Sequence, residues 1–145
     1  MTQPPFHLPH FLPYLLNQAA EAASREFQDY YRAQYGMLRT EWRVLFHLGC
    51  YGDLSAKQIC EKALIHKTKV SRAVAALEGK RYLTRDPSPE DRRIEVLSLT
   101  ASGVAVFKDL SRAAEGFEGK LQDGLTTSEI AALRRALLTL SNLPS

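Results

Sequence analysis

One stretch of the chain, residues 65–78, constrains the fold more than any other, because it has two distinct faces at the α-helical period. Apolar residues recur on one face at i, i+3, i+4 and i+7, which predicts packing against a core. These residues are Val70, Ala73, Val74 and Leu77. The other face is small, hydrogen-bonding and cationic, and it holds Thr68, Ser71, Arg72 and Ala75. Such a face fits a DNA major groove, where Arg reads guanine edges and Ser or Thr reads several bases.

A short helix and a hairpin are predicted on either side of this two-faced helix. Ser55 is a good N-cap for a helix that runs through Lys62, and residues 63–65 make a tight connection to the two-faced helix. A helix, a brief turn and a second helix with a polar basic face form the helix-turn-helix pattern. Residues 83–100 then predict two short strands around a turn that is stiffened by proline.

The positive charge of the chain is concentrated in one segment. The 145 residues fit one globular domain with a real core, and their formal charge is +3. Residues 57–93 hold ten Lys or Arg side chains and five acidic ones. A localised excess of positive charge suggests an anionic partner, and nucleic acid is the simplest candidate. A merely solvated basic face would explain the charge alone about equally well.

The N-terminal part of the chain predicts an arm and two helices. Residues 1–13 hold four of the seven prolines and predict an extended arm. A long helix follows from about Tyr14, and Gly36 stops it. Thr40 is a plausible N-cap for a second helix that reaches about Cys50.

The C-terminal part of the chain predicts two further helices. Thr100 starts a long helix, and residues 126–129 form a capping box that opens the last one. The helices at the two ends carry more apolar surface than one small winged module can cover. A second copy of the chain is an economical way to bury that surface, so we expect a homodimer.

Three pieces of the sequence, in this order and spacing, carry a resemblance to a known family. They are residues 54–78, the Asp-Arg-Arg at 91–93, and the Leu-Thr-Ala-Ser-Gly at 99–103. Together they make the chain similar, over nearly its whole length, to the multiple-antibiotic-resistance regulator (MarR) family of winged helix-turn-helix transcription factors. The resemblance implies a recognition helix in each of two successive major grooves of double-stranded DNA and a wing arginine in the minor groove.

The resemblance also implies an organisation for the single MarR-like chain, residues 1–145. The expected fold is mainly α with a small β-wing. A winged helix-turn-helix lobe is expected over residues 40–100, and N- and C-terminal dimerisation helices over residues 10–36 and 101–145. The function that follows is a DNA-binding transcriptional regulator, a ligand-responsive repressor that binds a palindromic operator as a homodimer.

The helix-turn-helix supplies most of the expected DNA contacts. Thr68, Ser71 and Arg72 are expected to meet base edges, which specify the sequence. Lys67 and Lys69 are expected to meet phosphates, which position the protein. Three residues at the start of the preceding helix can direct backbone N–H groups and side chains at a phosphate. These are Ser55, Lys57 and Gln58, although N-capping explains the serine about as well.

The wing supplies Arg92 and Arg93. Arg93 matches the family's wing position best, and Asp91 matches the residue that braces it by a salt bridge. An ordinary surface ion pair between them would be worth only about 0–1 kcal/mol. The chain departs from the family in two places: Arg81 stands where a glycine is usual after the recognition helix, and His66 stands where Asn or Asp is commoner at its start.

In the family, small anionic aromatic compounds bind in a crevice between the dimerisation helices and the winged lobe. The matching segments here hold six candidate ligand-binding residues. They are His10, Tyr14, Trp42, Arg43, Phe46 and His47. Core aromatics and a surface arginine would explain them too, yet an aromatic pocket with a few polar groups is what an aromatic carboxylate requires. Arg43 or a histidine would have to meet the carboxylate, because an unpaired buried charge is costly.

The two cysteines and the histidines suggest no firm chemistry. Cys50 and Cys60 are most simply small buried hydrophobes, and cysteine-based redox sensing is the alternative. His47 and Cys50 share a helix face, and His7 and His10 offer two more nitrogens. Two ligands are not a metal site, so no metal is expected.

Other classes of function find little support in the sequence. We expect no enzyme and no cofactor, because no phosphate-binding glycine loop, metal-ligand set or nucleophile–base spacing rises above chance. No apolar run is long enough for a membrane span, and no basic start with an apolar run marks a secretory signal, so a reduced cytoplasmic protein is expected. A winged fold that binds a protein and no DNA is the remaining alternative, and the basic segment argues against it.

Overall fold

A computed structural model describes residues 5–142 of the chain. Its elements are η1 (Leu8–His10), α1 (Leu12–Tyr35), α2 (Arg39–Tyr51), α3 (Ala56–Ala63), α4 (Lys67–Gly79), β1 (Leu83–Pro87), β2 (Glu95–Leu99), α5 (Ala101–Asp123) and α6 (Thr127–Ser141). The predicted fold class, mainly α with a small β-wing, is therefore confirmed. Residues 1–4 of the expected arm and residues 143–145 of the expected dimerisation region lie outside the described residues.

The chain divides into two compact units. The winged unit is residues 27–112, and the terminal unit combines residues 1–26 with residues 113–145. Both boundaries fall inside long helices, α1 and α5. The DNA-binding lobe expected over residues 40–100 and the dimerisation lobe expected over residues 10–36 and 101–145 are functional divisions. The compact units do not test them, so they stay predictions.

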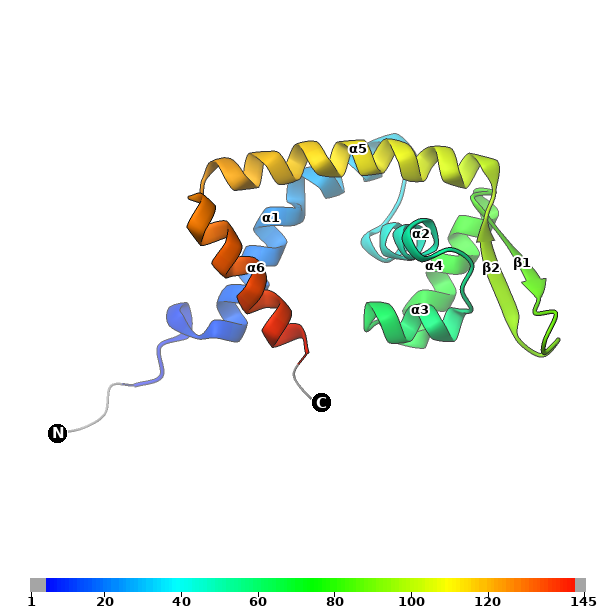
Figure 1. Cartoon of the computed structure of the whole chain (residues 1–145), viewed down its shortest axis with the longest axis horizontal. Helices are drawn as coiled ribbons and strands as arrows, with labels where there is room; N and C mark the ends of the chain where they lie inside the picture. The colour runs from blue at the N-terminus through cyan, green and yellow to red at the C-terminus, as the bar shows by residue number, and fades with distance from the viewer. Residues whose placement is uncertain (1–4, 143–145) are drawn as a thin grey trace. The chain divides into compact units, whose positions relative to one another are not determined.

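The winged unit holds a buried core to which α4 contributes its whole apolar stripe. The four stripe residues of α4 are each at most 3% exposed. Val44, Leu45 and Leu48 of α2 are buried to the same degree. Burying a side chain of this size contributes about 1.5–3 kcal/mol. Figure 1 shows α2, α3 and α4 gathered beside the two strands.

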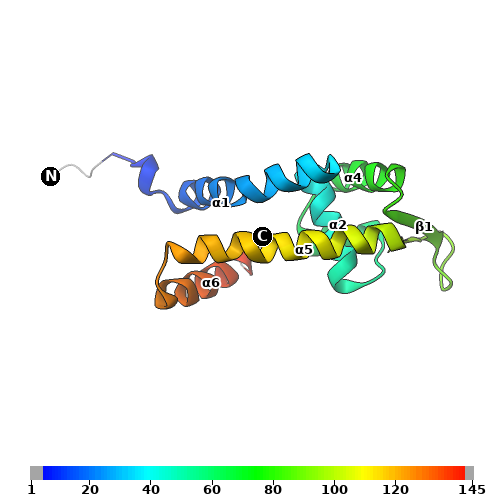
Figure 2. The same ribbon diagram turned by 90° about the horizontal axis from the view of Figure 1, so that it is seen from above.

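The two strands form an antiparallel hairpin that is tied to the helix-turn-helix. Leu83 pairs with Leu99 at one end of the ladder, and Pro87 pairs with Glu95 at the other. Leu54, just before α3, exchanges two backbone hydrogen bonds with Leu97 of β2, at 3.2 and 2.8 Å. The hairpin extends beyond the helices of its unit in both views, Figures 1 and 2.

Several predicted helix ends are confirmed. Ser55 and Thr126 each form a complete capping box, in which the side chain accepts from the N3 backbone and the N3 side chain accepts from the cap. Gly36 follows α1 with φ of 62°, a conformation that glycine adopts without steric penalty. Short-range chemistry alone decides these ends.

The predicted start of the second helix is wrong. Thr40 is not its N-cap, because α2 begins at Arg39 and Leu38 occupies the cap position without a side-chain cap hydrogen bond. The physical reason lies one residue earlier. Met37 is fully buried and its N–H donates to the carbonyl of Tyr31, so tertiary packing fixes where the chain turns into the helix.

The predicted arm is also partly wrong. The described arm residues are not simply extended, because η1 forms one 3-10 turn over Leu8–His10. The helix that follows begins at Leu12 rather than Tyr14. Pro13 therefore lies in its first turn, where a proline removes an N–H that has no helical partner in any case.

In the terminal unit, α6 turns back after α5, as Figures 1 and 2 both show. Within residues 5–26 and 113–142, no side chain falls in the buried class. An apolar groove of about 340 Å³ runs between the first half of α1 and the helices that end the chain. Its apolar lining consists of Leu16, Ala19, Ala20, Ala23, Leu121, Leu125, Ile130, Leu133 and Leu137.

Candidate nucleic-acid interface

The polar face of α4 is open to solvent over its whole length. All five DNA-contact candidates on this helix are exposed, whereas the neighbouring stripe residues are buried. The exposed candidates are Lys67, Thr68, Lys69, Ser71 and Arg72. The two-faced pattern thus separates the residues that hold the helix in place from those that a partner can reach.

The first turn of α4 is capped by an unusual residue. His66 occupies the N-cap position, and its Nδ1 accepts a hydrogen bond from the backbone N–H of Thr68 at 3.2 Å. The ring nitrogen therefore does what an Asn or Asp side chain does at this position in the family. The departure from the family pattern at His66 therefore leaves the start of α4 intact.

The start of α3 presents backbone and side-chain donors. The Oγ of Ser55 accepts from the N–H of Gln58 at 3.2 Å, and the Oε1 of Gln58 accepts from the N–H of Ser55 at 2.9 Å. Both oxygens are therefore used in capping. The N–H groups of Ala56 and Lys57 have no partner inside the helix, and together with the exposed Lys57 ammonium they are the groups left for a phosphate.

An open hollow of about 370 Å³ lies where α3, α4 and the hairpin meet. It brings together two groups of candidates that are distant in sequence, Ser55 and Lys57 from the start of α3 and Ser71 from α4. Arg85 and Glu95 of the two strands complete its polar lining. The winged unit thus places the start of α3 beside the recognition face of α4.

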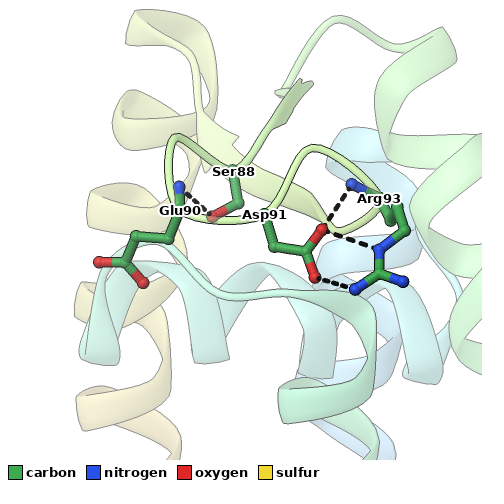
Figure 3. Close-up of polar contacts among 4 residues, drawn as sticks. All are labelled: Ser88, Glu90, Asp91 and Arg93. Carbon is green, nitrogen blue, oxygen red and sulfur yellow. Dashed lines mark hydrogen bonds and ion pairs between the residues drawn. The ribbon is translucent and has the colours of Figure 1, made fainter.

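The wing ends in a structured loop that carries a braced arginine. The carboxylate of Asp91 accepts three hydrogen bonds from Arg93, from its backbone N–H, its Nε and its Nη2, each at 3.1 Å (Figure 3). Ser88 supports the same loop, since its Oγ accepts from the N–H of Glu90 at 3.3 Å. The salt bridge expected between Asp91 and Arg93 is therefore present.

The electrostatics of the wing tip keep both partners charged. Hydrogen bonds from Arg93 lower the pKa of the Asp91 carboxyl below its ordinary value, and the same contact raises the pKa of Arg93. The side chain of Arg93 is nevertheless 90% exposed, and Arg92 beside it is exposed too. A fixed but accessible guanidinium is suited to enter a narrow minor groove.

The junction after α4 adopts the conformation that the missing glycine would have provided. Arg81 has φ of 65°, so a non-glycine residue takes the left-handed region here. Its N–H donates to the carbonyl of Glu78 at 2.9 Å, and its carbonyl accepts from Thr100 Oγ1 at 2.7 Å. The departure from the family pattern at Arg81 is therefore accommodated by hydrogen bonds from its N–H and to its carbonyl.

Arg85 is a site residue that the sequence did not indicate. Its Nε contacts Glu78 Oε1 at 3.1 Å, and its Nη1 lies 3.8 Å from Glu95 Oε2. One guanidinium thereby links the wing to the end of the recognition helix. The two residues in the shorter contact lie on different elements, α4 and β1, so neither the helical nor the strand period pairs them.

The six ligand-binding candidates are divided between the two units. His10 and Tyr14 belong to the terminal unit, and the other four lie on α2 in the winged unit. The guanidinium expected to meet a carboxylate already has a partner, because Arg43 Nη2 donates to the carbonyl of Ala63 at 2.6 Å. The Nδ1 of His47 lies 2.6 Å from the carbonyl of Arg43.

Trp42 and Phe46 belong to an aromatic cluster. Trp42 stacks on Tyr31 with ring centroids 5.9 Å apart and meets Phe27 edge-on at 5.2 Å. Phe46 lies against both Trp42 and Phe107, at 5.2 and 5.1 Å. The buried Nε1 of Trp42 finds no acceptor among the described residues. The cluster is mainly a packing feature, and it contains one buried donor that has no acceptor within it.

The cysteines and the other titratable groups add no further site. The expectation that both cysteines are small buried hydrophobes is wrong for Cys50, which is exposed in the last turn of α2, and Cys60 is only half-buried. Both are free thiols. Within residues 5–142, no group of three or more His, Cys, Asp or Glu side chains is arranged to hold a metal ion. No helix in that part of the chain is both long enough and apolar enough to cross a bilayer.

The fold and the site together define a winged helix-turn-helix protein. Two comparisons with sequences narrow this class. The MarR family model matches residues 35–94. HTH-type transcriptional regulator MhqR of Bacillus subtilis is 34% identical over 77 residues, which are 53% of this chain and 53% of that protein, so the match spans about half of the relative. Multiple antibiotic resistance protein MarR of Salmonella typhimurium is 24% identical over 127 residues, 87% of this chain and 85% of that one.

Solved structures agree with the sequence comparisons. The MarR family transcriptional regulator SPO1453 of Silicibacter pomeroyi is 28% identical, with a TM-score of 0.79 over 94% of this chain and 99% of that one. BpsR of Bordetella bronchiseptica is 23% identical with a TM-score of 0.88, over 97% of this chain and 100% of that one, and shows the shared fold. These comparisons support a MarR family winged-helix transcriptional regulator.

Proposed function

We propose that the chain acts as a homodimeric repressor that binds a palindromic operator in double-stranded DNA and responds to a small anionic ligand. The observation that carries this proposal is the pairing, on one unit, of the exposed cationic face of α4 with an arginine braced at the wing tip. The helix is expected to read base edges in the major groove, and the wing to enter the adjacent minor groove.

Two copies related by a two-fold axis would bind two half-sites about 10 bp apart, one turn of B-form DNA. Because Lys67, Lys69 and the start of α3 are assigned to phosphates, the affinity should fall steeply as salt rises. The salt dependence distinguishes this function from that of a winged module that binds only proteins. Such a module would show no salt-dependent affinity for a DNA duplex.

The experiment that tests DNA binding is selection of bound duplexes from a random pool, followed by fluorescence anisotropy with the recovered operator. Arg93→Ala should weaken operator binding at least about fivefold, because it removes the minor-groove contact. Lys108→Ala is the matched control, since it removes one exposed positive charge from α5 of the same unit. Equal affinities of the Arg93→Ala variant and the wild-type protein would exclude the wing from the mechanism.

Support for the homodimer comes from the terminal unit. Its apolar groove is lined almost entirely by leucine, isoleucine and alanine side chains, apart from Glu118, Gln122 and Arg134. Exposed apolar surface of this extent marks an interaction site. In a two-fold interface the same surface patch of two copies meets, so the groove of one chain would pack against the same helices of the other.

The ligand assignment is supported by chemistry near Trp42. Its leftover Nε1 donor lies in an aromatic cluster, and Arg43 follows it in sequence. BpsR, which shares the fold, has its DNA binding regulated by 6-hydroxynicotinic acid. A ligand can lower operator affinity only if it binds the DNA-incompetent conformer more tightly.

Trp42 is the single tryptophan of the chain, so its fluorescence, titrated with a panel of hydroxylated aromatic acids, reports binding directly. A panel that changes neither this fluorescence nor operator affinity would remove the ligand from the proposal.

A further inference from the structure

Glu41 is a buried charge that DNA binding, as described above, does not use. Among the described residues, it is the only charged one in the buried class, with 6% of its surface exposed. Its Oε1 accepts from the Nζ of Lys80 at 3.1 Å. The same ammonium donates to the carbonyl of Gly36 at 2.8 Å. One lysine therefore meets both a buried carboxylate and the end of α1.

This ion pair is not explained by stability alone. The side chain of Glu41 is 8% exposed and that of Lys80 is 30% exposed, so burial of the carboxylate offsets much of the attraction between the two charges. Where such pairs persist, the best-attested role is to fix one arrangement of the elements that they join. The elements joined here are the connection from α1 to α2 and the end of α4.

The position of Lys80 makes this arrangement important for the recognition helix. Lys80 is the C-cap residue of α4. The two residues that follow are held from the other side, because Thr100 donates from Oγ1 to the carbonyl of Arg81 and from its N–H to the carbonyl of Tyr82. A Cβ at Gly103 would overlap that same Tyr82 carbonyl, so α5 approaches it closely. The end of α4 is thus held between α5 and the α1–α2 connection.

Glu41 also lies next to the DNA-facing side of α4. An open hollow of about 390 Å³ is lined by Glu41 of α2 together with Lys69 and Arg72 of α4. Without Lys80, the Glu41 carboxylate would lose the ammonium that it contacts and would attract these two cationic side chains. Each is assigned to DNA, one to a phosphate and one to a base edge.

We propose that Lys80 is a positioning residue for operator recognition: by neutralising Glu41 and binding the end of α1, it fixes the orientation of α4 and leaves Lys69 and Arg72 free for DNA. Lys80 itself does not contact the duplex. The inference rests on the proposed function, since it concerns how the recognition helix is held for sequence-specific binding.

The test measures binding of Lys80→Met to the selected operator and to a random duplex over a series of salt concentrations. A positioning role predicts a loss of about tenfold in operator affinity and a much smaller loss on random duplex, so that the ratio of the two affinities falls. The slope of log affinity against log salt should fall by no more than about 0.9, the single phosphate contact assigned to Lys69. Lys67→Met is the matched control, because a lost phosphate contact should lower the slope by about 0.9 and weaken both duplexes to the same extent. Equal losses on the two duplexes in Lys80→Met would overturn the inference.

A double-mutant cycle with Glu41→Gln tests whether Lys80 acts through Glu41. The loss of operator affinity in Glu41→Gln/Lys80→Met should be well below the product of the two single losses, because the misplaced carboxylate is gone. Multiplicative losses would mean that the two residues act independently, and would contradict the inference.

If Lys80→Met alone does not fold in a thermal melt, the double variant still decides the question, because it leaves no unpaired buried charge. It keeps Lys69 and Arg72 free but lacks the ammonium that binds the end of α1, so it should lose operator affinity by less than about tenfold and keep the wild-type salt slope. A lower slope would overturn the inference. A wild-type chain that selects no duplex at all would instead refute the proposed function. The two failures are therefore distinguishable.

Discussion

The two units of the chain differ in how much of their apolar surface they bury. Every buried hydrophobic residue of the described chain lies in the winged unit. The terminal unit holds most of the large exposed ones, for example Leu12 at 64% and Leu138 at 65%. Both units are built from helices with an apolar face, so the helical pattern alone does not distinguish them. The winged unit completes its own core, whereas the terminal unit leaves its apolar face exposed, and the proposed homodimer would cover that face.

The largest effect is expected where the terminal unit meets its partner. Leu133→Glu combined with Leu137→Glu places two charges in the apolar groove, and burying them in an interface is costly. We expect the dimer dissociation constant to rise by at least about a thousandfold, or roughly 4 kcal/mol, as measured by sedimentation equilibrium. The winged unit should keep its near-ultraviolet circular dichroism. A variant that stays dimeric would show that the groove is not the interface.

A glycine pair on α5 tests whether close packing is confined to the winged unit. Gly103→Ala should lower the free energy of unfolding by about 3 kcal/mol, because its Cβ would overlap the backbone of Tyr82. Gly116, on the same helix but in the terminal unit, has open space around its Cβ position. Gly116→Ala should therefore raise the free energy of unfolding by about 0.5–1 kcal/mol. Urea denaturation measures both, and equal effects at the two sites would contradict the difference in packing.

The smallest effect is a pH dependence inside the winged unit. Asp109 accepts hydrogen bonds from the hydroxyls of Tyr35 and Tyr30, and these bonds lower the pKa of its carboxyl. A lowered pKa in the folded state stabilises the protein above the unfolded pKa, and this contribution is lost as pH falls through the folded one. Asp109→Asn should thus be less stable than wild type near neutral pH, and the difference should shrink below about pH 4. A difference that does not vary with pH would contradict this assignment.

Local signals predicted much of the site. The apolar stripe of α4, the capping boxes at Ser55 and Thr126, and the pairing of Asp91 with Arg93 all depend on residues within one or two helical turns or one loop. Interactions over this distance are set by backbone geometry that the sequence pattern reveals directly.

Contacts between distant segments were not predictable in the same way. Lys80 and Glu41 are 39 positions apart, and no periodicity relates them. The hydrogen bond from Arg43 to the carbonyl of Ala63, twenty positions away, was not predictable either, and the expected contact of Arg43 with a ligand stays a prediction. The start of α2 was misplaced for the same reason, because the burial of Met37 outweighed the capping preference of Thr40.

In the proposed function, two copies of the chain place their recognition helices together on one duplex. The most direct measurement is the mass of the complex with the selected operator by analytical ultracentrifugation, repeated with about five base pairs inserted between the half-sites. Two chains per duplex are predicted, with affinity falling at least about tenfold after the half-turn insertion, because the two helices then face opposite sides of the DNA. One chain per duplex, or an affinity that does not change with the insertion, would contradict binding of the operator by two paired recognition helices.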